Sequence, residues 1–364
     1  MGNYFLAIDQ GTTSTRTVLY GSNFTALDQN QIEIRQYYPR PGYVEHDAQE
    51  IWDKTFSTVS SLLEKNGLDA SQIISIGITN QRETIVGWDQ KTGKPIGRAI
   101  VWQDKRTTDY CKTLQNQGVE KEVIEKTGLL LDPYFSASKL RWLNDNFKEE
   151  IVNKNILFGT IDTFLLWKLT KGDVYATDVS NAARTSLLNI STLDWDQDLI
   201  KLFELEKINL PEIKKNADDF GSTTLFGGDI KISGMAGDQQ AALFGQTCFE
   251  AGDIKSTYGT GCFLILNTGN QILRSQNKLL TTIGYKIDQE VVYALEGSIF
   301  IAGALIQWLR DKMKFFISAP ESEGLAKIAN ENSELIIVPS FTGLGAPFWN
   351  PDIKGSIHGI SLDT

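Results

Sequence analysis

The sequence predicts an α/β protein built from two related halves. Short runs of strand-forming residues alternate with amphipathic helical stretches along the chain, beginning with the apolar run Tyr4–Ile8. A Gly- and Thr-rich hairpin near the N-terminus is repeated in similar form at residues 252–267. A repeat of this kind suggests two related halves that hold one nucleotide from either side.

The first hairpin, residues 4–20, has the composition of a phosphate-binding turn. Two strand-like runs flank the small polar connector Gln10–Ser14. Gly11 would let the backbone approach a ligand closely, and consecutive N–H groups with Thr and Ser hydroxyls can hold phosphate oxygens. Asp9 ends the first run, where its carboxylate could reach a metal ion on those phosphates. The alternative is an ordinary hairpin with hydroxyls in its turn.

The following elements have the order of an α/β layer. Residues 30–37 alternate apolar and polar and predict a third strand. A helix is expected from an N-cap at Asp47 to a stop at Gly67. Residues 73–79 form the near-continuous apolar run of a buried parallel strand, and residues 84–88 a further strand.

The middle of the chain is mainly helical, and the second half returns to strands. Helical patterns between residues 104 and 171 predict elements that decorate the sheet. Asp238 stands at the expected N-cap of a helix that begins at Gln239. The second hairpin turns at Gly259–Gly261, and a helix is predicted over residues 298–315.

Composition limits the possible partners and location. The net charge of −10 argues against nucleic acid as the main ligand. Three widely spaced cysteines suggest neither a disulfide framework nor a zinc site, which fits a reducing compartment. No apolar run approaches membrane-spanning length, so we expect a cytoplasmic protein without membrane insertion.

Most familiar catalytic motifs are missing. The pair Gly93-Lys94 lacks the upstream Gly of a Walker A loop, and neither G-x-G-x-x-G nor G-x-S-x-G occurs. With His46 and His358 as the only histidines, a histidine-based metal site or a Ser-His-Asp triad has few residues to draw on. Phosphoryl transfer remains open.

Seven motifs in the same order along the chain carry a resemblance to a known family. They are AIDQGTTSTR from Ala7, ITNQRET from Ile78, AIVWQDKR from Ala99, DPYFSASK from Asp132, GDQQAALFGQ from Gly237, YGTGCF from Tyr258 and TGLGAPFW from Thr342. Together they resemble the glycerol kinases of the FGGY carbohydrate kinase family, over nearly the whole chain. Single motifs could arise by chance, but seven in order are specific.

The resemblance implies a fold, a reaction and two substrates. The fold would be the actin-like, ribonuclease H-like ATPase fold, with two related domains, each around a five-stranded sheet, and the active site between them. Residues 1–248 would form the N-terminal domain, which binds glycerol and phosphate, and residues 249–364 the first part of the nucleotide-binding C-terminal domain. The reaction would be ATP-dependent phosphorylation of glycerol to sn-glycerol 3-phosphate, with Mg²⁺ and with ATP and ADP as nucleotide partners.

The resemblance also implies roles for individual residues. Asp238 would be the general base for the attacking hydroxyl of glycerol, with a pKa lowered by its helix-cap position, and Asp9 would hold Mg²⁺. The positions that match nucleotide contacts are Thr12, Thr13, Ser14, Arg16, Thr260, Gly303 and Gln307. Those that match glycerol contacts are Arg82, Glu83, Trp102, Tyr134, Asp238, Gln239 and Phe263. Without the family, Arg82-Glu83 would suggest a surface ion pair and Trp102 a core residue.

The chain also departs from the family pattern. The stretch between Phe220 and Ser233 lacks the Arg-bearing loop linked to sugar-phosphate inhibition, and it has no histidine to be phosphorylated. The family continues beyond Thr364, so the resemblance predicts an incomplete second domain and little kinase activity for this chain. Alternatives are an impaired or regulatory remnant and a kinase of another polyol or ketose. Complete family members are expected to be homo-oligomers.

Overall fold

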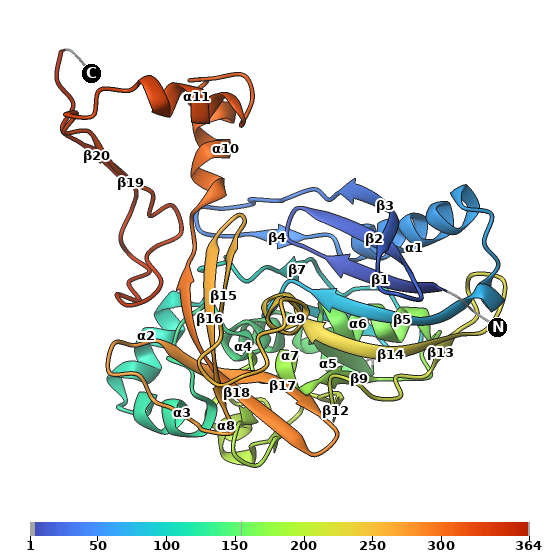
Figure 1. Cartoon of the computed structure of the whole chain (residues 1–364). Coiled ribbons are helices and arrows are strands. Elements are labelled where there is room, and N and C mark those ends of the chain that lie inside the picture. The colour runs from blue at the N-terminus through green and yellow to red at the C-terminus, as the bar shows by residue number, and fades with distance from the viewer. Residues whose placement is uncertain (1–3, 154, 363–364) are drawn as a thin grey trace.

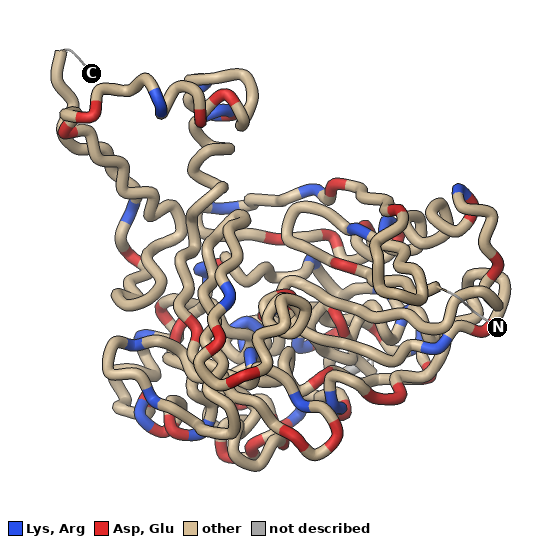
Figure 2. The backbone as a smooth tube through the Cα atoms, in the orientation of Figure 1, with Lys and Arg blue, Asp and Glu red and all other residues tan. Residues whose placement is uncertain are grey.

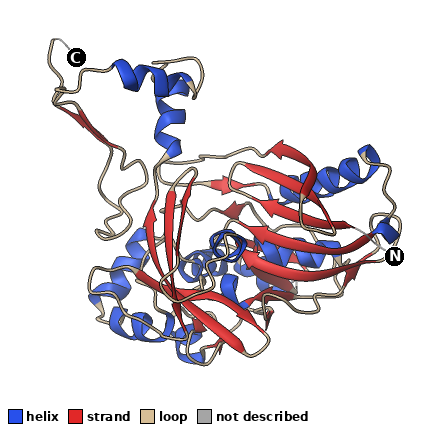
Figure 3. Ribbon diagram, viewed as in Figure 1, coloured by secondary structure: helices blue, strands red, loops and turns tan. Residues whose placement is uncertain are grey.

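The computed structural model describes residues 4–153 and 155–362. Two sheets lie next to each other, and helices pack against and below them (Figures 1 and 3). Residues up to Gly237 form the larger sheet, and the chain then enters the second sheet at residue 254. The predicted α/β class is therefore observed.

The first sheet has six strands in the order β13-β14-β5-β1-β2-β3. Strands β1, β2 and β3 form an antiparallel meander, and β5 and β14 run parallel to β1 and to each other. The bounds are β1 (Tyr4–Gln10), β2 (Ser14–Gly21), β3 (Ala26–Glu33), β5 (Ile73–Asn80), β13 (Ser222–Thr223) and β14 (Ile230–Gly237).

One face of this sheet carries the main core. Alternate residues Leu6 and Ile8 of β1 are buried in one cluster with side chains of helices α1 (Ala48–Lys65) and α6 (Ile161–Leu169). The carboxylate of Asp47 caps α1 by accepting from the N–H of Gln49 at 2.9 Å. The predicted N-cap at Asp47 is therefore confirmed.

Two predicted elements have the wrong bounds. The third strand was expected at residues 30–37, but β3 runs from Ala26 to Glu33, because its ladder with β2 extends from Ala26 opposite Tyr20 to Glu33 opposite Ser14, where β2 begins. Its mostly exposed side chains alternate weakly, so the pattern did not mark its start. The helix expected over 298–315 is shorter, and it is α10 (Gly303–Asp311). It begins later than expected because strand β18 stays paired with β16 as far as Ile299.

The second sheet has four strands among the described residues, where the resemblance had implied five, and all its pairs are antiparallel. Their order is β15 (Ile254–Tyr258), β16 (Cys262–Gly269), β18 (Glu290–Ile299) and β17 (Leu280–Ile287). The next strand, β19 (Ile336–Val338), pairs with β20 (Ser356–His358) instead of joining this sheet at β15. Figure 1 shows α10 and α11 (Glu321–Ile328) extending away from both sheets.

Smaller elements complete the fold, and several of those between residues 104 and 200 contact the second sheet (Figure 1); for example, the N–H of Thr281 in β17 donates to the carbonyl of Gly128. A third sheet has the order β4-β7-β6-β8, with β4 (Glu45–His46), β6 (Ile85–Asp89), β7 (Ala99–Ile100) and β8 (Ile156–Thr160). The remaining strands are β9 (Ala176–Asp178), β10 (Leu188–Asn189), β11 (Asp194–Trp195) and β12 (Glu212–Lys214). The remaining helices are η1 (Ala70–Gln72), α2 (Thr108–Asn116), α3 (Glu120–Thr127), α4 (Ser136–Asn146), α5 (Lys148–Asn153), α7 (Val179–Ala182), α8 (Gln197–Leu202) and α9 (Asp238–Gly245).

Candidate active site

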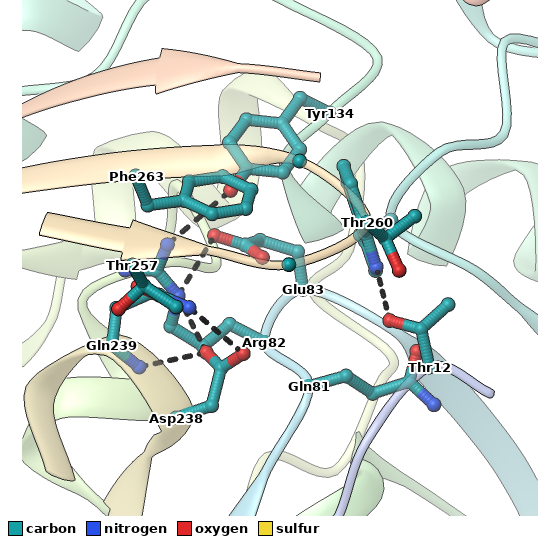
Figure 4. Close-up of a pocket in the computed structure, with 13 residues that line it drawn as sticks. Thr12, Gln81, Arg82, Glu83, Tyr134, Asp238, Gln239, Thr257, Thr260 and Phe263 are labelled. Atoms are coloured by element: carbon teal, nitrogen blue, oxygen red, sulfur yellow. Dashed lines mark hydrogen bonds and ion pairs between the residues drawn. The ribbon is translucent and has the colours of Figure 1, made fainter. Parts of the chain in front are cut away.

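A cavity of about 160 Å³ lies between the two sheets (Figure 4). This volume is below the roughly 300–1,000 Å³ of sites for drug-sized ligands and suits a small substrate. All seven residues predicted to contact glycerol line it. The lining residues are Thr12, Gln81, Arg82, Glu83, Trp102, Tyr134, Asp238, Gln239, Thr257, Gly259, Thr260, Gly261 and Phe263.

Strand register brings the two central charged residues together. In the parallel pair of β5 and β14, Asn80 lies opposite Gly237. Arg82 follows β5 and Asp238 follows β14, so both side chains emerge from neighbouring carboxyl ends, where ligands bind in such sheets. A Cβ at Gly237 would lie 2.7 Å from Cγ and Cδ of Arg82, so this close crossing requires glycine.

Asp238 has a different local role from the predicted one. Gly237 is the N-cap of α9 and Asp238 is its first residue, where Oδ1 accepts from the N–H of Gln239 at 2.8 Å. Burial raises the pKa of Asp238, and the nearby charge of Arg82 offsets only part of this. The expectation that the helix lowers this pKa is therefore wrong. A raised pKa makes the carboxylate a stronger proton acceptor.

The guanidinium of Arg82 is largely engaged within the protein. Nη1 lies 2.7 Å from Oε2 of Glu296, and Nη2 lies 2.9 Å from Oε1 of the same carboxylate. Nη1 also donates to Gln240 at 3.2 Å, while Nη2 reaches the hydroxyl of Tyr134 at 3.4 Å. Nε lies 3.4 Å from Oδ1 of Asp238. The two terminal nitrogens of Arg82 thus bind the carboxylate of Glu296, and its Nε lies toward Asp238.

Glu83 completes a buried group of charges. Its carboxylate accepts from Nε of Arg184 at 2.6 Å, and Arg184 also donates to Glu296 at 3.1 Å. Glu83 itself has φ of 62°, an uncommon conformation for a residue with a side chain. Oε1 of Glu83 lies 3.9 Å from Nε of Arg82.

Aromatic rings form one wall of the cavity. The ring of Trp102 lies edge-on to those of Tyr134 and Phe263, with centroids 5.8 and 5.9 Å apart. Its Nε1 donates to Oγ1 of Thr12 at 2.9 Å, which links this wall to the first hairpin. The predicted combination of aimed polar groups and an apolar wall is present.

Two buried lysines that the sequence did not single out support the site. Nζ of Lys139 donates to the carbonyl oxygens of Pro133, Tyr134 and Phe135 at 2.7, 2.5 and 3.1 Å, and so fixes the backbone that carries Tyr134. Nζ of Lys255 donates to the amide oxygen of Gln239. Burial lowers the pKa of each lysine to about 8.

The first hairpin, between β1 and β2, reaches the cavity lining through Thr12, at the opposite end from Arg82 (Figure 4). Its turn closes through the N–H of Gly11, which donates to the carbonyl of Ser14 at 3.0 Å. Asp9 pairs with Arg16 at 2.5 Å, and both side chains are partly exposed. Among the described residues, no group of three or more His, Cys, Asp or Glu side chains could hold a metal ion. Mg²⁺ bound at Asp9 would therefore need most of its ligands from water and phosphate oxygens.

The second hairpin packs against the start of α10. The N–H of Gly303 donates to the carbonyl of Gly259 at 2.9 Å, and a Cβ at Gly303 would come within 2.7 Å of that oxygen. Thr260 lines the cavity, as Thr12 does from the opposite hairpin. Other predicted nucleotide contacts lie outside its lining; they are Thr13, Ser14, Arg16, Gly303 and Gln307.

Comparison with family models assigns the whole architecture. Residues 4–245 match the N-terminal domain of the FGGY family of carbohydrate kinases, and residues 254–364 match its C-terminal domain. The chain belongs to the FGGY family of carbohydrate kinases. The resemblance found in the motifs is confirmed, and the chain is an enzyme of the kinase class.

Curated relatives within the FGGY family are close in sequence. A glycerol kinase of Rhizobium meliloti (strain 1021) is 54% identical over the whole chain, and one of Ligilactobacillus salivarius (strain UCC118) is 49% identical over 99% of it. The chain spans 74% and 73% of the length of these two proteins.

Solved FGGY kinases have the same fold. Plasmodium falciparum glycerol kinase with ADP has a TM-score of 0.85 and 37% identity, and the match covers 100% of this chain and 74% of that one. A xylulose kinase from Lactobacillus acidophilus has a TM-score of 0.82 at 24% identity, with 98% and 72% covered, and shows the fold alone. The predicted actin-like, ribonuclease H-like fold is confirmed.

Charged residues of both signs are spread along the backbone. Figure 2 shows Lys and Arg interspersed with Asp and Glu along the chain, on a protein with net charge −10. Among the described residues, no helix combines the length and the apolar character needed to cross a membrane.

Proposed function

We propose that this FGGY kinase transfers the γ-phosphoryl group of ATP to glycerol and forms sn-glycerol 3-phosphate and ADP. The observation that carries this proposal is the arrangement in the cavity, where Asp238 and Arg82 lie 3.4 Å apart in a space of about 160 Å³. Glycerol has three hydroxyl groups and a short carbon face, which correspond to the polar residues and the Trp102 wall. The named relatives support the same substrate.

Asp238 acts as the general base in this proposal. Its carboxylate accepts the proton of the terminal hydroxyl as that oxygen attacks the γ-phosphorus. One P–O bond forms to glycerol, the bond between the γ-phosphorus and the bridging oxygen breaks, and the electron pair leaves with ADP. Arg82, Glu83 and Gln239 orient the other hydroxyls, and the aromatic wall excludes water from the reacting oxygen.

The two hairpins hold the nucleotide phosphates between them. Backbone N–H groups near Gly11 and the hydroxyls of Thr12 and Thr260 suit phosphate oxygens. Asp9 would hold Mg²⁺, directly or through water, and Arg16 beside it adds positive charge. When bound, Mg²⁺ would neutralise charge on the phosphate oxygens.

Binding and turnover test this proposal separately. Calorimetric titration of the purified chain with glycerol, in the presence and absence of ADP, measures whether the site accepts the polyol. A coupled ADP-release assay then compares glycerol with xylulose and with no acceptor. Glycerol-dependent ADP release that is absent in Asp238→Asn supports the proposal. Equal ADP release with xylulose and with glycerol, or no binding of glycerol, contradicts it.

Location and assembly are further parts of the proposal. We expect a cytoplasmic enzyme that forms homo-oligomers, as the family resemblance implies. Cell fractionation and light scattering of the purified protein test these two expectations.

A further inference from the structure

Glu296 is a fully buried carboxylate that the second sheet contributes to the site. It lies in β18, with Ile265 of β16 opposite it on one side and Leu280 of β17 on the other. Its two oxygens accept from both terminal nitrogens of Arg82, at 2.7 and 2.9 Å. A strand paired on both sides holds its side chains more rigidly than a loop would. Glu296 is therefore a fixed support for the Arg82 side chain.

The surroundings of Glu296 keep it ionised. Burial alone would raise its pKa, but Arg184 and Arg82 hold the pKa of Glu296 at about 2. Oε1 also accepts from Arg184 at 3.1 Å and from the hydroxyl of Ser298 at 2.8 Å. The carboxylate thus has several charged and neutral donors and stays negative at neutral pH.

The buried charges of Arg82, Arg184 and Glu296 are not explained by a contribution to folding stability alone. Buried ion pairs usually contribute little compared with apolar residues of the same size, because each charge loses its hydration. Nη1 of Arg184 is buried and has no hydrogen-bond partner among the described residues, so the group is not fully satisfied. A need to hold the Arg82 guanidinium in one position explains these buried charges better.

The alternative partners of Arg82 show what that requirement is. Its Nε lies 3.4 Å from Asp238 and 3.9 Å from Glu83. Without Glu296, the guanidinium would be free to turn its two terminal nitrogens onto the base. A bidentate pair between Arg82 and Asp238 would occupy the carboxylate that must receive the substrate proton.

We propose that Glu296 is a positioning residue that holds the guanidinium plane of Arg82, so that Arg82 faces the polyol without pairing tightly with Asp238. The inference rests on the proposed function. It also makes the polyol site depend on both sheets, because Arg82 follows β5 of the first sheet and Glu296 lies in the second. Glu296 acts on glycerol through Arg82 and does not line the cavity itself.

The test compares Glu296→Gln with Glu290→Gln, the same change at an exposed position of the same strand. Glycerol and ADP affinities are measured by calorimetry on both variants and on the wild-type chain. We expect Glu296→Gln to weaken glycerol binding by about tenfold or more, since it removes a charged partner of Arg82. Its ADP affinity, and both affinities of Glu290→Gln, should stay within about twofold of wild type.

A milder variant keeps the inference testable if Glu296→Gln does not fold. Ser298→Ala removes one donor to Glu296 and leaves the charges in place, so it should weaken glycerol binding by a few-fold, again without effect on ADP. An equal loss of both affinities in a folded Glu296→Gln protein would indicate a purely structural role and overturn the inference. If Glu296→Gln does not fold, an unchanged glycerol affinity in Ser298→Ala would also overturn the inference. If the wild-type chain binds no glycerol, the proposed function fails and this inference with it.

Discussion

Nε of Arg82 lies 3.4 Å from Oδ1 of Asp238, at the ends of two adjacent parallel strands. The distance is longer than that of a strong charged hydrogen bond, because the terminal nitrogens of Arg82 are held by Glu296. Oδ2 of Asp238 accepts from Nε2 of Gln239 at 3.1 Å, and a carboxylate oxygen can accept a further hydrogen bond from a substrate hydroxyl.

Asp238→Asn should abolish turnover and preserve ligand binding. Asparagine has nearly the same size but cannot accept the proton of glycerol, so the rate should fall by about a hundredfold or more. Glycerol and ADP affinities, measured by calorimetry, should change far less than the rate. A variant that keeps a near-normal kcat would remove Asp238 from the role of base.

Arg82→Lys should affect glycerol much more than ATP. An ammonium group cannot make two parallel hydrogen bonds to Glu296 and also retain a donor for the polyol. Steady-state kinetics with each substrate varied in turn should give a raised KM for glycerol and a nearly unchanged KM for ATP. A change confined to the ATP dependence would place Arg82 on the phosphate side.

Lys139→Met should destabilise the protein near neutral pH, and the loss should shift with pH. The substitution leaves the carbonyls of Pro133, Tyr134 and Phe135 without their donor, which should cost about 1–3 kcal/mol for each unpaired buried group, less any water that replaces the lysine. Denaturant unfolding of the wild-type protein and of Lys139→Met measures this difference in the free energy of unfolding.

The pH dependence of Lys139 has a definite sign. Burial lowers its folded-state pKa to about 8, below the usual value of 10.5. Between these two values the unfolded chain binds more protons, so this group makes unfolding harder as pH rises, by about 1.4 kcal/mol per pH unit. The wild-type protein should gain stability relative to Lys139→Met from pH 8 to 10. A constant difference would show that Lys139 keeps a normal pKa.

Gly303→Ala should weaken nucleotide binding through the second hairpin. The new Cβ would come within 2.7 Å of the carbonyl of Gly259, so either the Gly259–Gly261 turn or the start of α10 must move. ADP affinity should fall while glycerol affinity is nearly retained, as calorimetry can measure. Gly324→Ala, in an open position of α11, is the matched control and should leave both unchanged.

Local patterns in the sequence predicted much of the first domain. Buried strands such as residues 73–79 and the cap at Asp47 have strong local signals, since burial and hydrogen bonding act within a few residues. The bounds of β3 were missed because its side chains are mostly exposed, and sheet pairing alone sets its start. The motifs identified the residues that line the cavity, but not the raised pKa of Asp238, which depends on burial by distant segments.

The residues that support the site had no local signal. Glu296 and Arg184 are 112 positions apart and meet only after the two sheets come together. A glutamate such as Glu296 normally indicates a solvent-facing position, and Lys139 and Lys255 similarly suggest exposed side chains. Their burial depends on the tertiary structure, so periodicity could not reveal it.

The register of β5 against β14 has a consequence for binding energy. Arg82 lies two residues after β5 and Asp238 directly after β14, with Asn80 opposite Gly237 in the ladder between them. Neither side chain depends on a mobile loop to reach its place, so little conformational entropy is lost there when a substrate arrives. A very small ligand makes few contacts, and this preorganisation lets those few contacts contribute almost fully to affinity.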